Sequence, residues 1–391
     1  MKFAKIFILI LFAPFWSTIT ATTPSFSLKI TNSSSKELIG EVVEISGSEI
    51  LGLQGKNVKV TDSAGKTVPS QFTYDGNLLV YGNFPANLTT EYSVNIVLEE
   101  ETIESDTICV GQIRHEMQDD YAWENDRGGY RLYGPSYRAG GGKVSGYDIW
   151  TKSVDYPTLK QRYDDHAHYG MSYHQDFGSG MDVYTVGPTL GAGMNALMVG
   201  DSICYPIAYQ KCDILDNGPL RVTAKITCYP ENIGDDHDVV ETRIISLDRG
   251  DWLNRTTVRY DGLTHSRPIT TGIVVHKQNK HAYAIDQDQR HLAYVDLTDN
   301  PTNNNGAIFI GIVNPQTPDS IKYVPFEKEI ADALGQVQTF STIPPASDYT
   351  YYWGAGWSKG GVKGMDAWIQ YLSDFYTHLK SPLEVTLSKP R

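Results

Sequence analysis

Ionisable and aromatic side chains are concentrated in the stretch from His115 to Gly187. This stretch holds four of the ten histidines of the chain: His115 itself, His166, His168 and His174. Buried polar groups cost free energy unless they are paired, so this density predicts a cleft that binds a polar molecule. Aromatic rings stack on the C–H faces of sugars, and carboxylates accept hydrogen bonds from hydroxyls. The stretch therefore predicts a sugar site.

The histidine-rich part of this stretch supplies the candidates for proton transfer. His166 and His168 would share one face of an extended segment, and Tyr173, His174 and Asp182 follow. Imidazole titrates near neutral pH, so we expect His166, His168, His174 and Tyr173 to be catalytic, with Asp182 in contact with the sugar. The glycines between positions 170 and 180 predict a loop. Two histidines and an acid could also bind a divalent metal, the only cofactor that the sequence suggests. A structural role is the third alternative.

A second group of candidates lies upstream, at Trp123, Glu124, Asp126, Arg131 and Tyr133. On strands, Glu124 and Asp126 would face one side, and Arg131 and Tyr133 would share another. This pattern predicts a sugar subsite in which the Trp stacks, the acids bind hydroxyls and the Arg binds a carboxylate bidentately. A core salt-bridge network is the alternative, because structural ion pairs have the same composition.

Further candidates for sugar contacts lie near strand ends or in aromatic, glycine-rich segments. They are Asp148, Trp150, His276, Lys277, Trp357 and Lys359. A strand-end histidine can reach a cleft, a tryptophan ring can form a stacking platform, and a lysine can hold an anionic group. Taken singly, each is more readily explained as a structural residue.

Alternation of apolar and polar residues predicts the elements that position these candidates. Residues 25–32, 37–45, 58–62, 77–82 and 91–99 predict short strands of a small β-sandwich. Later segments, 219–230, 238–248, 254–262, 270–277, 291–297 and 306–313, predict a large antiparallel sheet system. Apolar residues at helical spacing predict two helices, at residues 326–338 and 366–380.

The N-terminus has the pattern of an export signal. Two lysines precede an apolar run from Ile6 to Phe15, and small residues follow as far as Ala21. We expect a signal peptide at 1–21, an N-terminal β-sandwich at 22–108 and a larger β domain at 109–391. The mature protein would be periplasmic or secreted, without an integral membrane segment. Its four cysteines could form disulfides in three pairings or stay free.

Charge and motifs exclude several classes of function. The formal net charge is −13, which disfavours nucleic acid as a partner. The glycines before Lys143 lack the spacing of a phosphate-binding loop, and no serine-hydrolase elbow or zinc-protease helix motif occurs.

Several ordered motifs resemble a known family. WENDR, YRLYGP, GYDIWTK, YHQDFGSGMDVYTVGPTLGAG and YYWGAGWSK are similar to segments of domain-of-unknown-function family 4861, a group of exported bacterial proteins associated with polysaccharide utilisation. The resemblance covers nearly the whole mature chain. It implies an all-β fold, a galactose-mutarotase-like β-supersandwich preceded by a small β-sandwich. It also implies an oligosaccharide partner, notably one that contains uronate, but no agreed reaction.

Together these features predict an exported carbohydrate-active protein, with an enzyme that cleaves uronate-containing oligosaccharides by β-elimination as the leading hypothesis. Arg131 or Lys359 would neutralise the carboxylate, His168 or His174 would be the base, and Tyr173 the acid.

Two other functions remain open. A non-catalytic carbohydrate-binding protein would use Trp123, Trp150 and Trp357 as platforms. A glycoside hydrolase would use two carboxylates such as Glu124 and Asp148. All these hypotheses require the candidate segments to meet in one pocket.

Overall fold

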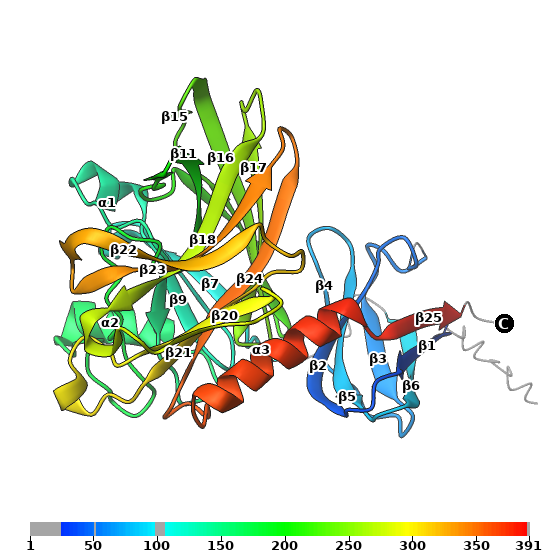
Figure 1. Cartoon of the computed structure of the whole chain (residues 1–391). Coiled ribbons are helices and arrows are strands. Elements are labelled where there is room, and N and C mark those ends of the chain that lie inside the picture. Colours follow the sequence, from blue (N-terminus) through cyan, green and yellow to red (C-terminus); the bar gives the residue numbers. More distant parts are fainter. Residues whose placement is uncertain (1–24, 51, 98–105, 389–391) are drawn as a thin grey trace, which may run out of the picture.

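The computed structural model describes residues 25–50, 52–97 and 106–388 (Figure 1). The predicted signal peptide lies outside these residues. Within them, no helix is long and apolar enough to cross a membrane.

The N-terminal part is the predicted small β-sandwich. Its strands are β1 (Ser25–Asn32), β2 (Leu38–Ile45), β3 (Val58–Asp62), β4 (Ser70–Phe72), β5 (Leu78–Phe84) and β6 (Leu88–Ile96). One sheet has the order β25-β1-β6-β3 and the other β2-β5-β4. Alternate residues such as Leu28, Ile30 and Val94 point between the sheets and are fully buried.

The last strand of the chain belongs to this small sandwich. β25 (Glu384–Ser388) pairs antiparallel with β1, so that Leu387 lies opposite Leu28. Residues near the two ends of the described chain therefore share one sheet (Figure 1). The small sandwich thus contains residues from both the segment 22–108 and the segment 109–391.

The larger part is a second sandwich, which confirms the prediction of an all-β supersandwich. A nine-stranded sheet has the order β13-β14-β16-β17-β24-β21-β20-β19, with β15 paired to β16, and a five-stranded sheet has the order β12-β11-β18-β23-β22. The strands of the first are β13 (Lys211–Asp216), β14 (Arg221–Thr227), β15 (Glu231–Ile233), β16 (Asp236–Asp248), β17 (Leu253–Asp261), β19 (Tyr283–Ile285), β20 (His291–Asp296), β21 (Ile308–Val313) and β24 (Asp348–Trp357). Those of the second are β11 (Ala192–Val199), β12 (Ser202–Cys204), β18 (Arg267–His276), β22 (Ser320–Ile330) and β23 (Ala333–Ile343).

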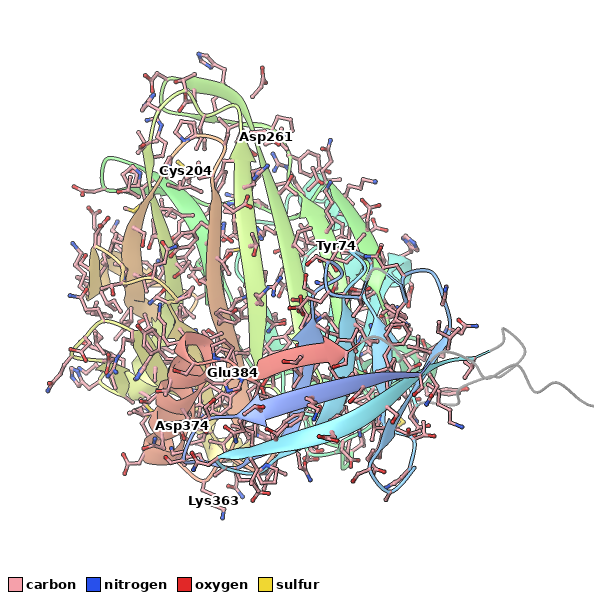
Figure 2. The ribbon with its side chains drawn as sticks, turned by 90° about the vertical axis from the view of Figure 1, so that its right-hand side faces the viewer. Tyr74, Cys204, Asp261, Lys363, Asp374 and Glu384 are labelled. Carbon is pink, nitrogen blue, oxygen red and sulfur yellow. The ribbon has the colours of Figure 1, made fainter. Side chains whose placement is uncertain are left out.

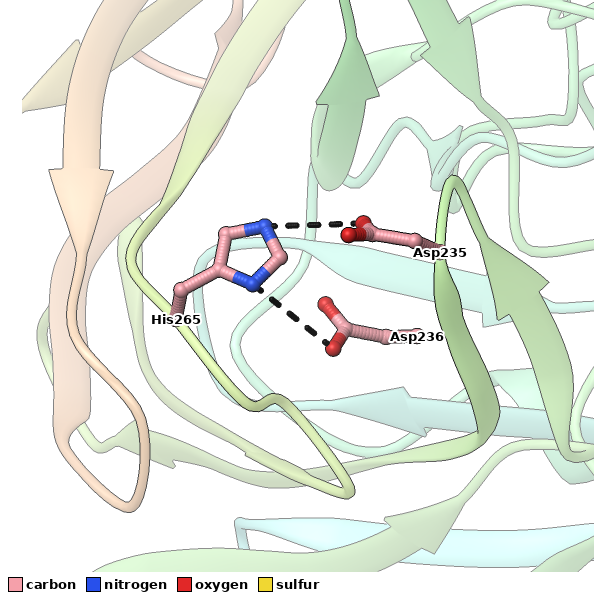
Figure 3. A group of neighbouring side chains, drawn as sticks. All are labelled: Asp235, Asp236 and His265. Carbon is pink, nitrogen blue, oxygen red and sulfur yellow. Dashed lines mark ion pairs between the residues drawn. The ribbon is translucent and has the colours of Figure 1, made fainter.

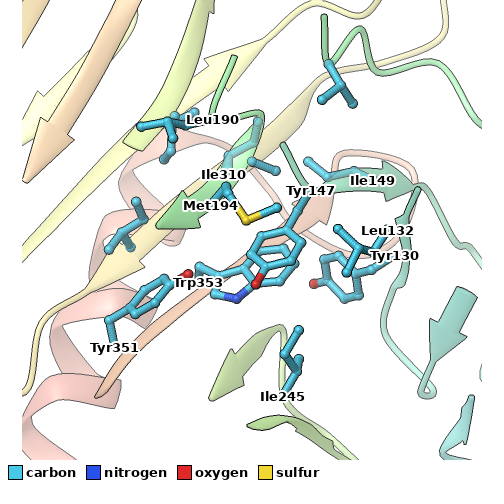
Figure 4. Close-up of a cluster of buried hydrophobic side chains, with 14 of the residues drawn as sticks. Tyr130, Leu132, Tyr147, Ile149, Leu190, Met194, Ile245, Ile310, Tyr351 and Trp353 are labelled. Atoms are coloured by element: carbon cyan, nitrogen blue, oxygen red, sulfur yellow. The ribbon is translucent and has the colours of Figure 1, made fainter. Parts of the chain in front are cut away.

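A four-stranded sheet completes the large sandwich. Its order is β10-β9-β8-β7, with β7 (Val110–Arg114), β8 (Asp120–Glu124), β9 (Gly129–Leu132) and β10 (Asp148–Trp150). All three sheets contribute to one apolar core. Its aromatic centre contains the rings of Tyr147 and Trp353, which stack with centroids 4.0 Å apart (Figure 4).

The helix predicted for residues 326–338 is wrong. This segment is the hairpin of β22 and β23, which meet at Ala331 and Asp332. Both turn residues have positive φ, 49° and 65°, as the tight turns that join antiparallel strands require. Asp332 is a common turn residue but Ala331 is not, so the turn signal was weak, and the spacing of Ile330, Leu334 and Val337 matched that of an apolar helix face.

The helix predicted at 366–380 is confirmed as α3 (Met365–Lys380), which packs on β20 and β21. Two shorter helices, α1 (Pro135–Ala139) and α2 (Leu159–Tyr169), were not predicted. Three single 3-10 turns occur at His115–Met117, Lys277–Asn279 and Pro301–Asn303. The four cysteines are all free thiols.

Candidate functional site

A buried acidic centre forms around Arg131 on the four-stranded sheet. Arg131 on β9 lies directly opposite Asp148 on β10, and its Nε donates to Asp148 Oδ2 at 2.8 Å. Its Nη2 donates to Asp182 Oδ2 at 3.0 Å, and Nη1 lies 3.8 Å from Asp120 Oδ2 on β8. Asp182 reaches the centre because its segment bridges to Trp150 at the edge of β10. One guanidinium therefore holds three carboxyl groups.

The acidic centre has more carboxyl groups than positive charge. Burial is the largest cause that raises the pKa of Asp120 and of Asp148 to about 7, and that of Asp182 to about 6, against the opposing effect of Arg131. These carboxyl groups therefore retain protons at a pH where an exposed aspartate has lost them. Arg131 itself is fully engaged, which corrects the prediction that it is available to neutralise a substrate carboxylate.

Aromatic side chains separate the acidic centre from solvent. The guanidinium of Arg131 lies 5.0 Å from the ring of Tyr133 and 5.4 Å from that of Trp150. Trp150 is buried, and the ring of Tyr173 covers it at 4.8 Å. Burial raises the pKa of Tyr173, so its hydroxyl stays protonated at neutral pH. Tyr173 is therefore a proton donor at the surface of the centre.

Two of the predicted histidines lie against Tyr173. The ring of His166, on α2, is 4.3 Å from the Tyr173 ring. His174 is half-exposed, and its Nδ1 lies 2.8 Å from the backbone oxygen of Asp182 and 3.7 Å from Asp182 Oδ2. If Nδ1 carries the proton and donates to that oxygen, Nε2 is left as a free base. His174 is thus placed for proton transfer beside the acidic centre.

A polar groove runs from Tyr173 along α2. It lies between this helix, the loop of residues 171–180 and the segment before the helix, with a cavity volume of about 290 Å³. Its polar lining comes from Thr158, Gln161, Asp165, Ser172 and Gln175. This volume is near the lower end for small-molecule sites, which span roughly 300–1,000 Å³.

Exposed apolar side chains surround this groove. Tyr156 is 55 % exposed, Phe177 58 % and Met171 37 %, and all three line the groove. Large apolar side chains at such exposure, gathered around a polar hollow, are typical of binding surfaces rather than of folding. The prediction of sugar-stacking aromatics missed Tyr156 and Phe177, because it relied on tryptophans.

A guanidinium also lines the groove. Arg162 on α2 donates from Nη1 to the Thr151 carbonyl at 3.0 Å and from Nε to the Ser179 hydroxyl at 3.2 Å, and Nη2 donates to the Ser179 carbonyl. Within the described residues no carboxylate lies within 4.0 Å of it. Asp176 fixes the same loop by accepting hydrogen bonds from the amides of Gly178 and Gly180. The groove is therefore preformed and contains an unpaired positive charge.

Two predicted site residues on β8 have structural roles instead. Trp123 points to the core side of the sheet, is 1 % exposed and donates to Asn254 Oδ1 at 2.7 Å, so its ring offers no platform to a ligand. Glu124 accepts from the amides of Thr158 and Leu159 at the start of α2 and pairs with Lys152 at 2.7 Å. It caps the helix, so the carboxylate pair expected of a glycoside hydrolase, Glu124 with Asp148, is not available to a substrate.

Asp126 lies beyond the end of β8 and accepts from the amide of Gly250 at 2.7 Å, away from the acidic centre. The indole of Trp357 is buried and donates to the Asn305 carbonyl at 2.8 Å. Lys359 donates to the Asn304 carbonyl at 2.7 Å. Trp357 is therefore not a stacking platform, and Lys359 is held at the end of β24 by a backbone oxygen.

The remaining predicted residues are also outside the groove. His276 is buried at the end of β18, where its Nδ1 lies 2.6 Å from Asp296 Oδ2. Lys277 is exposed and pairs with Glu329 and Asp332 of the β22–β23 hairpin. His168 is exposed near the end of α2. The extended geometry expected for His166 and His168 is wrong, because both lie on a helix.

A metal site is not supported where the sequence suggested it. Among the described residues, the only side chains close enough to share an ion are Asp235, Asp236 and His265 (Figure 3). Arg267 already occupies this group: it donates to Asp235 and, at 2.8 Å, to Asp236. The group is an ion-pair cluster whose carboxylates are engaged, so its donor set does not fit a metal.

The family of the chain is shown by a family model described as "Domain of unknown function (DUF4861)", which matches residues 30–385. The chain belongs to this family. The resemblance seen in the sequence motifs is therefore confirmed. A relative from Formosa agariphila, described as "Uncharacterized protein P7", is 27 % identical over 365 residues, which cover 89 % of each chain.

Two solved structures from Enterococcus faecalis match this chain in part. One is a protein in the glycosyl hydrolase family 38, with 10 % identity and a TM-score of 0.45, and the other is an alpha-mannosidase, with 8 % identity and a TM-score of 0.41. The match covers 95 % and 94 % of this chain but only 48 % and 46 % of theirs. The chain thus spans about half the length of these proteins, and no site residue is transferred from them.

Proposed function

We propose that this DUF4861 protein is an exported, carbohydrate-active enzyme that binds an acidic oligosaccharide in the groove along α2. The observation that carries the proposal is the gathering of exposed Tyr156, Phe177 and Met171 around a polar hollow that also contains Arg162. The rings would stack on sugar C–H faces, and the polar side chains would bind hydroxyls. Arg162 takes the role first expected of Arg131, because its charge is not paired with a carboxylate within 4.0 Å in the described chain.

The chemistry proposed where Tyr173 lines the groove, with the ring of His174 4.6 Å from that of Tyr173, is β-elimination. His174 Nε2 removes the proton from C5 of a uronate whose carboxylate faces Arg162. The C–O bond at C4 then breaks, a C4–C5 double bond forms, and the Tyr173 hydroxyl gives its proton to the leaving oxygen. The backbone oxygen of Asp182, 2.8 Å from His174 Nδ1, accepts a hydrogen bond from the imidazolium that forms and stabilises it.

Binding tests the groove directly. Titration calorimetry with oligogalacturonate should show binding that weakens about tenfold or more in Phe177→Ala and in Tyr156→Ala, because each removes a stacking ring. The matched control is Tyr74→Ala, a tyrosine 51 % exposed on the small sandwich, which should leave affinity unchanged. Equal affinity of all four proteins would disprove the groove as the site.

Turnover tests the reaction. Ultraviolet absorbance reports the double bond of the product, and His174→Ala should lower its rate of appearance by about 100-fold or more. The neighbouring His168→Ala, on the exposed side of α2, is the control and should keep full activity. Binding without any absorbing product would leave the groove as a sugar-binding site and reject elimination.

A further inference from the structure

A second cavity lies at the far end of the large sandwich. Its volume is about 130 Å³, and it opens between β11–β12 of one sheet and β15–β17 of the other. Cys204, one of its lining residues, is labelled near the top of Figure 2, whereas the small sandwich, marked by Glu384, is lower. No residue lines both this cavity and the groove along α2. The two hollows are therefore separate.

A buried carboxylate forms part of the lining of this cavity. Glu241 on β16 is 7 % exposed, and its Oε1 accepts from Asn195 Nδ2 at 2.7 Å and from Arg243 Nε. Its second oxygen, Oε2, accepts no hydrogen bond from the described part of the chain. Nη2 of Arg243, which is buried beside Glu241 and does not line the cavity, also lacks a partner among the described residues. Because Glu241 lines the cavity, Oε2 is free to accept a hydrogen bond from a hydroxyl group of a ligand there.

Aromatic rings form three walls of the cavity, and each is held in place. The hydroxyl of Tyr260 accepts from Asn195 Nδ2 at 2.9 Å, and that of Tyr205 accepts from Gln336 Nε2 at 3.0 Å. The ring of Tyr229 lies 4.3 Å from the Arg138 guanidinium. Because the rings are fixed before a ligand arrives, little ordering cost would oppose binding.

The fourth wall is the β15–β16 hairpin, which carries Asn232 and Ile233 into the cavity. Ion pairs with Arg267 fix this hairpin, because Arg267 at the start of β18 in the other sheet donates to both Asp235 and Asp236. The cluster of Asp235, Asp236 and Arg267 thus has a structural role: it holds the hairpin in place beside the opening of the cavity.

We propose that this cavity is a second ligand site and that it binds a single neutral sugar ring. Its size admits one ring, and its tyrosines and apolar side chains suit the C–H faces of a sugar. Polar groups lie at both ends, with Glu241 inside and Glu231 and Asn232 at the mouth, so hydroxyls on opposite edges of the ring are bound. An aromatic alcohol would satisfy only one end. An acidic sugar is disfavoured, because both charged lining residues are carboxylates.

Ligand-observed NMR and calorimetry with D-glucose, D-galactose, D-mannose and D-xylose test the site on the full chain. At least one should bind with a Kd of about 0.1–10 mM, as expected for a single ring. Tyr229→Ala should weaken this binding about tenfold or more, and Glu241→Gln should do the same without changing the shape of the wall. Tyr74→Ala, which lines neither hollow, is the matched control and should have no effect.

Glu241→Gln leaves Arg243 without its partner and could unfold the protein, so a test on the unaltered chain is also needed. Cys204 lines the cavity, whereas Cys212 has similar exposure but does not. The bound sugar should slow alkylation of Cys204 by iodoacetamide at least threefold and leave the rate at Cys212 unchanged.

The site proposal is overturned if none of the four sugars binds or protects Cys204. It is also overturned if benzyl alcohol binds there and no sugar does. Neither result bears on the groove, because oligogalacturonate binding is measured separately and depends on Phe177 and Tyr156.

Discussion

Two buried charge clusters lie on the same face of β8, one at each end of the strand. At one end Glu124 pairs with Lys152, and the amides of Thr158 and Leu159 supply the other hydrogen bonds that the carboxylate needs. At the other end Asp120 joins the acidic centre, where Arg131 is the only arginine or lysine of the described chain that pairs with the three acids. The first cluster is balanced in charge and closed. The second has an excess of acid, and the ring of Tyr173, which lies 6.0 Å from its guanidinium, lines the groove.

Comparing the two clusters shows which buried charges have a structural role and which could take part in proton transfer. A balanced pair with every position filled has no capacity to exchange a proton with a ligand. An acidic centre whose carboxyl groups keep protons near neutral pH has that capacity, and groups with shifted pKa values gather at functional sites. We therefore expect a neutralising substitution to lower the free energy of unfolding much more in the balanced pair than in the acidic centre.

The largest effect is expected at the closed pair. Lys152→Met leaves the Glu124 carboxylate buried without its cation, which should lower the free energy of unfolding by ~3–5 kcal/mol. Denaturant unfolding measures this loss. The double variant Glu124→Gln with Lys152→Met should recover part of it, because no charge then remains unpaired. If Lys152→Met were as stable as the wild type, the Glu124 carboxylate would not depend on Lys152 for its stability in the folded protein.

A smaller effect is expected at the acidic centre. Asp182→Asn removes one of three carboxyl groups while keeping an oxygen that can accept from Arg131, and Asp148 still pairs with the guanidinium. The free energy of unfolding should change by about 1 kcal/mol or less. The same denaturant experiment decides the comparison: a loss as large as that of Lys152→Met would show that the centre is as closed as the pair.

The sequence predicted much of this region because strand alternation is a strong signal. It placed Arg131 with Tyr133 and proposed Asp148, Asp182, Tyr173 and His174 for the same site, and the structure brings these six together. It also proposed Trp123 and Glu124, without separating the two faces of β8. Because side chains alternate along a strand, Trp123 points to the core and Glu124 points toward α2. The number of aromatic residues in a segment does not show on which face each one lies.

The groove could not be predicted, because α2 has almost no helical pattern. Its sequence LKQRYDDHAHY buries only Leu159, Arg162 and Tyr163. The helix depends on tertiary contacts: the Glu124 carboxylate satisfies its first amides, and Leu159 and Tyr163 pack on Ala122 and Trp150. A contact such as that of Glu124 with Leu159, 35 positions along the chain, leaves no local signal. The same reason hid Tyr156 and Phe177, which flank the helix.

The last effect concerns pH and is seen only as a difference between two proteins. Burial raises the pKa of Asp182 from 3.8 to about 6. Between these values the folded state holds more protons than the unfolded state, so the contribution of this carboxyl to stability is full below pH 3.8 and is lost as the pH rises through 6. The amide that replaces the carboxyl in Asp182→Asn does not titrate. Relative to wild type, this variant should therefore gain stability from about pH 4 to pH 6 and then level off.

Denaturant unfolding of wild type and Asp182→Asn at several pH values measures this slope. Parallel curves for Asp182→Asn and wild type would show that Asp182 is already ionised in the folded centre, and the contrast between the two clusters would then rest on packing alone.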